Sequence, residues 1–116
     1  MMEHQFLSIE QLDQQLKQWN GKHIKIEKIE LTDKDEIHMN LTDIAYESHT
    51  RRLDQYEAMH TLILNGEGEI QSSQGYQPLP DASYEIPLED TSLYEFDGEQ
   101  FLLTTDRGVY RISLES

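Results

Sequence analysis

The first hydrophobic pattern in the chain has the spacing of an α-helix. Four apolar residues recur three or four positions apart and share one helical face: Ile9, Leu12, Leu16 and Trp19. This stripe predicts an amphipathic helix over residues 8–20. Ser8 is a favourable N-cap residue, and Gln11 three positions later completes a capping box. Gly21 suits the left-handed conformation that commonly ends a helix.

Two extended segments follow the helix, over residues 22–31 and 36–46. Apolar and polar residues alternate in each segment, but the apolar positions change phase after Ile26 and again after Leu41. A change of phase predicts a bulge, or a bend that turns the strand from one face to the other. Residues 32–35 have the composition of a turn. The two segments are therefore predicted to form an antiparallel hairpin.

The middle of the chain has shorter and less regular patterns. Residues 55–65 alternate as a strand does, although their first half also fits a short helix. The Asn65-Gly66 dipeptide is typical of a tight turn, while residues 67–72 also fit a continuation of the strand past a glycine kink. Residues 83–88 predict a short strand, and Pro87 places it at a sheet edge or end.

The C-terminal part predicts a meander of three strands over residues 93–96, 101–105 and 109–114. Asp97-Gly98 is a strong hairpin signal, which sets Tyr94 opposite Phe101. If Leu103 pairs with Ile112, one face carries Tyr94, Phe96, Phe101, Leu103, Tyr110, Ile112 and Leu114. A three-residue bulged loop between the last two strands would shift this register by one.

The sum of these elements predicts an α+β fold that is mainly antiparallel β. We expect a small barrel or sandwich of about seven strands with an N-terminal helix over residues 8–20. At 116 residues the chain is long enough for one core, so residues 1–116 are predicted to form a single domain.

Charge changes this picture by excluding classes of partner. The chain has 23 acidic and 9 basic residues, for a net charge of -14. No lysine or arginine lies between Arg52 and Arg107, a stretch that contains twelve acids. Such a surface repels nucleic acid and anionic lipid and suits a basic protein partner or a divalent cation. The alternative is a solvated acidic surface that only keeps the protein soluble.

Several chemical classes are excluded by composition. There is no cysteine, so disulfides, thiolate catalysis and cysteine-based zinc sites are absent. We find no signal peptide and no apolar run of membrane-spanning length, so the protein is expected to be cytoplasmic. The common nucleophile and phosphate-binding motifs are also absent, which favours a protein that is not an enzyme.

Histidines and clustered acids give no metal site by spacing. Glu57 and His60 are the nearest pair of possible ligands, but on a strand they point to opposite faces. His60 lies among apolar neighbours, which favours a core histidine with a hydrogen-bond partner. The acidic run at 33–36 lacks the ligand spacing of an EF-hand and is better explained as a turn. We therefore expect no metal and no cofactor.

One short segment concentrates positive charge and hydroxyl groups, at residues 48–52. Arginine binds anions and carboxylates bidentately, so this loop is a candidate ligand cradle. Its arginines would otherwise simply pair with nearby acids on the surface. The candidate ligand-binding residues are His49, Arg51, Arg52, Tyr56 and His60.

A resemblance to a known family supports a ligand-binding alternative. Residues 64–70, 79–81 and 86–87 resemble the rhythm of the second half of a cupin barrel. The resemblance implies a small β-barrel that binds a ligand. The places of the family's metal-binding histidines and glutamate hold Arg52, Asp54 and Met59, and no histidine follows residue 87 where the family has one. The implied barrel would therefore lack the usual metal ligands.

Three functional hypotheses follow from the sequence. The first is a non-catalytic interaction or accessory module with a basic protein partner and no nucleic acid or membrane partner. The second is a small-ligand-binding β-barrel, possibly an enzyme, with the candidate residues at its mouth. The third is a structural subunit that forms homo-oligomers by pairing of edge strands.

Overall fold

A computed structural model describes residues 5–31, 33–48, 60–72, 75–88, 92–106 and 108–115. The helical elements are α1 (Ile9–Leu16) and the 3₁₀ turns η1 (Lys17–Trp19) and η2 (Pro80–Ala82). The strands are β1 (Gln5–Leu7), β2 (His23–Glu30), β3 (Asp33–Asn40), β4 (Asp43–Ser48), β5 (His60–Asn65), β6 (Gly68–Ser72), β7 (Gly75–Pro78), β8 (Ser83–Leu88), β9 (Leu93–Phe96), β10 (Gln100–Thr105) and β11 (Gly108–Leu114).

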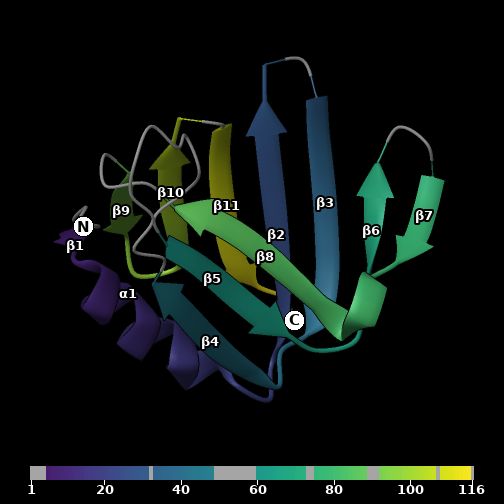
Figure 1. The fold of residues 1–116 in the computed structure, drawn as a ribbon, viewed down its shortest axis with the longest axis horizontal. Helices are drawn as coiled ribbons and strands as arrows, with labels where there is room; N and C mark the ends of the chain where they lie inside the picture. The colour runs from purple at the N-terminus through teal and green to yellow at the C-terminus, as the bar shows by residue number, and fades with distance from the viewer. Residues whose placement is uncertain are drawn as a thin grey trace.

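The strands form two open antiparallel sheets. The main sheet has eight strands in the order β1-β9-β10-β11-β2-β3-β6-β7, and the small sheet has the order β4-β5-β8. In Figure 1 the small sheet lies obliquely across one face of the main sheet, and α1 lies beside β4. The predicted fold, mainly antiparallel β with one N-terminal helix, is confirmed. Neither sheet closes on itself, so the predicted barrel or sandwich is not confirmed.

The N-terminal helix begins as its sequence predicts. The Ser8 side chain accepts from the Gln11 backbone N–H at 3.2 Å, and the Gln11 side chain accepts from the Ser8 N–H at 2.9 Å. This reciprocal pair is the predicted capping box. The α-helical part is shorter than predicted, because it ends at Leu16 and continues as the 3₁₀ turn η1. Gly21 has a φ of 86°, as expected where the helical segment ends.

The β2–β3 hairpin does not contain the bulge or bend that was predicted where the apolar positions change phase after Ile26. Pairing is continuous from His23 opposite Asn40 to Glu30 opposite Asp33, so β2 contains no bulge. Ile29 instead points to the face opposite Ile26, because it lies an odd number of positions away. The predicted turn at residues 32–35 is also wrong, because β3 already begins at Asp33.

The second change of phase marks a real bend. The chain leaves the main sheet after β3 and enters the small sheet at β4, with residues 41–42 between them. At the Asn65-Gly66 dipeptide the chain returns from the small sheet to the main sheet, because β5 belongs to the small sheet and β6 to the main sheet. The site is therefore a crossing between two sheets, rather than a tight turn or the continuation of one strand in the same sheet. A Cβ at Gly66 would collide with the backbone oxygen of Asn40, so only glycine fits this crossing.

The C-terminal meander forms β9, β10 and β11, with registers that differ from those predicted. Phe101 lies opposite Phe96 and Ile112, and Leu103 lies opposite Tyr94 and Tyr110. Each predicted pairing is off by two residues. An even shift leaves every side chain on its face, so the predicted set of residues still shares one side of the sheet.

The core lies between the main sheet, the small sheet and α1. Apolar side chains from all three are fully buried, including Leu12, Leu16, Ile24, Ile26, Ile37, Met39, Leu62, Leu64, Ile86 and Leu103. The Trp19 ring meets Phe101 edge-on at 5.0 Å, which places η1 against β10. We call the covered side of the main sheet its inner face and the opposite side its outer face. No helix among the described residues is long and apolar enough to span a membrane.

Candidate functional site

The outer face of the main sheet carries a row of charged side chains. Alternation along β2 buries Ile24 and Ile26 inside and turns His23, Lys25 and Glu27 outside. Strands β3 and β11 are in register with β2, so their own polar positions fall beside these residues. Polar side chains that are separate in the sequence are thereby placed side by side.

Glu27 is the centre of the first group on this face. Its side chain is only 12% exposed and accepts from Lys34 Nζ at 3.0 Å and from Arg111 Nη1 at 3.4 Å. The hydrogen bond from Lys34 lowers the pKa of Glu27 and outweighs the opposing effect of burial. Lys34 Nζ also lies 3.7 Å from a Glu36 oxygen. Lys34 is therefore shared between two acids, and Arg111 is paired with Glu27.

Two histidines and Glu115 form the second group. His38 Nδ1 lies 2.8 Å from Glu115 Oε2, and its Nε2 lies 3.4 Å from Glu36 Oε1. His23 Nε2 lies 3.2 Å from Glu115 Oε1, and its Nδ1 is hydrogen-bonded to Asn40. The hydrogen bond with Glu115 raises the pKa of His38, despite partial burial. Backbone pairing from the Glu115 N–H to the His23 carbonyl, 2.8 Å, holds this carboxylate in place.

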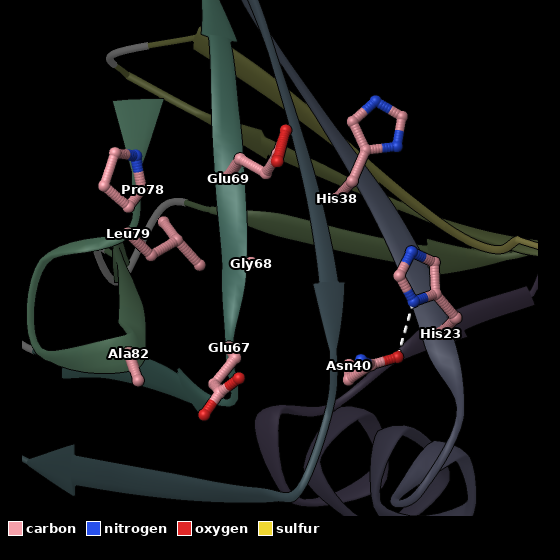
Figure 2. Close-up of a pocket in the computed structure, with 9 residues that line it drawn as sticks. All are labelled: His23, His38, Asn40, Glu67, Gly68, Glu69, Pro78, Leu79 and Ala82. Atoms are coloured by element: carbon pink, nitrogen blue, oxygen red, sulfur yellow. Dashed lines mark hydrogen bonds between the residues drawn. The ribbon is translucent and has the colours of Figure 1, made fainter. Parts of the chain in front are cut away.

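A hollow of about 640 Å³ opens beside these histidines. It is lined by His23, His38, Asn40, Glu67, Gly68, Glu69, Pro78, Leu79 and Ala82. Figure 2 shows the histidines on one side of the hollow and the segment from Pro78 to Ala82 on the other. Leu79 is only 7% exposed and gives the hollow an apolar wall. Glu67 and Glu69 are exposed, and neither carboxylate forms an ion pair with any residue that the structure describes.

Gly68 allows β6 to approach β3 at this site. A Cβ at Gly68 would collide with the backbone oxygen of His38 and with the Met39 side chain. The hollow therefore depends on a glycine whose role is close approach rather than a turn.

The arrangement is not that of a metal centre. In the described ranges, no group of three or more histidine, aspartate or glutamate side chains is placed to hold a metal ion. The imidazole nitrogens of His23 and His38 are instead hydrogen-bonded to Glu115, Glu36 and Asn40. Glu115 and Glu36 are therefore engaged with these rings, whereas Glu67 and Glu69 at the hollow form no ion pair with a described residue.

Of the sequence-predicted ligand residues, the structure describes His60. It lies on the side of β5 that also presents Leu62 to the core, and its Nδ1 is 2.7 Å from Tyr46 Oη. The two rings stack with centroids 5.5 Å apart. The predicted hydrogen-bond partner is present, but His60 is half-buried rather than the core histidine that was predicted. His60 does not line the hollow. His49, Arg51, Arg52 and Tyr56 lie outside the described residues, as does Glu57, so the predicted site stays a prediction.

The residues of the hollow were missed by the sequence-based search for motifs. The only signal for the histidines was alternation, since His38 lies between buried Ile37 and Met39 and His23 comes directly before buried Ile24. Nothing in that pattern relates them to Glu115, which is 77 positions from His38.

Comparison with known proteins places the chain in a family. The model of the YmzB-like protein family matches residues 5–116. The chain belongs to the YmzB-like family. A YmzB-like relative, the "Uncharacterized protein YmzB" of Bacillus subtilis (strain 168), is 37% identical over 111 residues, which cover 90% of this chain and 93% of the relative. No solved structure matches the chain.

Proposed function

We propose that this YmzB-like protein is a cytoplasmic, non-catalytic interaction module that binds a basic partner protein. The proposal rests on one contrast: acids in one part of the main sheet form ion pairs with bases, whereas exposed acids in the base-free strands do not. Three bases of β2, β3 and β11, namely Lys28, Lys34 and Arg111, pair with acids of these strands, Lys34 and Arg111 both with Glu27. Strands β4 to β10 contain no lysine or arginine in their described residues.

Several acids of this base-free part are directed to solvent. Glu67, Glu69, Glu85 and Glu99 are exposed, and none of them forms an ion pair within the described part of the chain. On the outward side of the small sheet, Glu85 is joined by the exposed Asp43. Uncompensated charge of one sign attracts a basic surface and speeds its association. The same charge makes nucleic acid an unfavourable partner.

Binding to a defined basic protein tests the proposal. The immobilised protein is expected to retain a small basic protein at about 0.05 M salt and to release it at about 0.5 M salt, where charges are screened over roughly 4 Å. An acidic protein of the same size is the control and should pass through at both concentrations. Retention that is equal at both salt concentrations, or no retention at either, would contradict the electrostatic proposal.

Small-ligand binding is a second candidate, and the hollow favours it. Its volume of about 640 Å³ lies within the range of roughly 300–1,000 Å³ usual for ligand pockets. Independently of the hollow, which His60 does not line, the segment with His49, Arg51, Arg52, Tyr56 and His60 remains a proposed site for an anionic ligand. Thermal-shift measurements with small anions test it, because a ligand that binds only the folded state raises the melting temperature. An Arg51→Ala/Arg52→Ala variant should lose that shift while its unliganded melting temperature stays unchanged.

A further inference from the structure

The hollow beside the histidines continues into a second hollow along β7. The second is about 230 Å³ and is lined by Gly68, Glu69, Tyr76, Gln77 and Pro78. Gly68, Glu69 and Pro78 line both hollows. The two hollows therefore adjoin each other over β6, β7 and η2, and we call them together the β6–β7 groove. In Figure 1 these two strands project past the small sheet, at the end of the main sheet.

The groove combines three features that suit a long cationic side chain. Glu67 and Glu69 offer carboxylates that no described residue neutralises. Pro78 and Leu79 offer an apolar surface for an aliphatic stem. Tyr76 is 66% exposed and offers a ring face at the far end. Lysine and arginine have both the stem and the charged head that this combination would bind.

The spacing of the two carboxylates indicates the conformation of the ligand. Glu67 and Glu69 are two positions apart on the segment that enters β6, and both line the hollow. Residues two apart on an extended chain project from the same side, roughly 6.6–6.8 Å from each other. The basic residues of an extended peptide have this same spacing when one residue separates them. In addition, β7 pairs with β6 alone among the described strands, so within the described part of the chain its outer edge is open beside the groove to an extended peptide.

We propose that the β6–β7 groove binds an extended segment of the partner protein that carries two basic residues separated by one residue. This inference rests on the proposed function and names its site and its ligand. One basic side chain lies against Glu67 and the other against Glu69, with Tyr76 stacked on the second. An anionic ligand is disfavoured here because the cationic form of His38 is already paired with Glu115 and Glu36.

Fluorescence anisotropy with two labelled peptides of equal composition tests this inference at about 0.15 M salt. The first peptide has a Lys-Xaa-Lys core and the second has Lys-Lys-Xaa. The first should bind about tenfold more tightly, since only its lysines reach both carboxylates together. Glu67→Gln/Glu69→Gln should weaken its binding about tenfold or more. Tyr76→Ala should weaken it about threefold, and Tyr76→Phe, which keeps the ring, should leave it unchanged.

A matched variant separates this inference from the broader proposal. Glu85→Gln/Glu99→Gln removes the same charge from exposed positions that do not line the groove, and it should weaken binding less than about twofold. Equal weakening by the two double variants, or equal affinity for the two peptides, would overturn the groove while leaving salt-sensitive binding of basic partners intact. No binding of either peptide, together with no retention of a basic protein at low salt, would overturn both. Circular dichroism of each variant establishes that it is folded.

Discussion

The two faces of the main sheet are built by the same strands and differ in almost every physical respect. On the inner face, Ile24, Ile26 and Ile37 are fully buried under the small sheet. On the outer face of the same strands, charged residues are partly exposed, and Glu27 is held by Lys34 and Arg111. The inner face therefore supplies most of the stability through burial of apolar area. The outer face can carry recognition, because most of its side chains lie outside the buried core and replacing them should cost little stability.

The outer face is itself divided. Its centre neutralises its own charges through paired side chains, whereas its end at β6 leaves Glu67 and Glu69 exposed beside an apolar wall. Paired charges in water contribute little to binding a partner, since they are already satisfied. The unpaired end, rather than the most highly charged part, is therefore the place where a partner of opposite charge gains most.

The largest expected effect comes from the inner face. Ile26→Ala removes a fully buried side chain and should lower the free energy of unfolding by about 3 kcal/mol. Ile29→Ala is the matched control on the same strand, because Ile29 points to the outer face and is partly exposed. It should cost less than about 1 kcal/mol. Urea denaturation of both variants measures the difference, and equal losses would contradict the division between faces.

The next effect concerns the approach of β6 to β3. Gly68→Ala adds a Cβ that meets the backbone of His38 and the side chain of Met39, so the strands must separate or distort. The expected loss is about 2–3 kcal/mol. Gly98→Ala has no neighbour within 4 Å but strains a φ of 99°, and it should cost only about 1–2 kcal/mol. A smaller loss for Gly68→Ala than for Gly98→Ala in thermal denaturation would show that the close approach is not needed.

A smaller effect is expected from the paired centre of the outer face. Glu27→Gln removes the carboxylate that Lys34 and Arg111 share, and it should lower stability by about 1–2 kcal/mol at pH 7. Because the pKa of Glu27 in the folded protein lies below its ordinary value of 4.5, this contribution is present above that value and is lost as the pH falls through the folded-state pKa. Glu69→Gln, which removes an unpaired charge on the same face, should change stability by less than about 0.5 kcal/mol.

The smallest effect depends on pH in the opposite sense. The pKa of His38 is raised above 6.5 by its hydrogen bond with Glu115, so its stabilising contribution is complete below that pH and is lost as the pH rises through the folded-state pKa. His38→Gln should therefore cost about 0.5–1 kcal/mol near pH 6 and nearly nothing near pH 9. Glu115→Gln should remove most of this pH dependence. Urea denaturation at several pH values measures the free energy of unfolding of each variant. A loss of stability in His38→Gln that is constant with pH would contradict the pairing of His38 with Glu115.

The parts of the fold that sequence predicted are those in which neighbouring residues decide the outcome. The Ser8 capping box, the stripe of Leu12 and Leu16, and the end at Gly21 all formed because each depends on contacts within one or two helical turns. The meander kept its predicted face even though its registers were off by two, because only an odd shift would have turned Phe101 outward. In contrast, the change of phase at Ile29 has no local cause in the backbone, since β2 stays regular there.

The candidate site was beyond prediction for a related reason. The hydrogen-bond ladder of a sheet is the same for any residue, so the sequence of a strand does not name its neighbours. Only the placement of β2 between β3 and β11 brings Glu115 within 3.2 Å of His23 and 2.8 Å of His38. Likewise, β6 joined β3 rather than β5, and this pairing opened the hollow beside Glu67 and Glu69.

The sequence by itself determined the helix with its cap, most of the strand segments, the side of the sheet that each meander residue occupies, and an acidic stretch without bases. These properties follow from periodicity and composition, which need no partner strand. The tertiary structure alone decided which sheet each strand joins, which registers they adopt, and which charges are neutralised. Those outcomes depend on packing between segments far apart in the chain, and the same packing decides which carboxylates remain free to meet a partner.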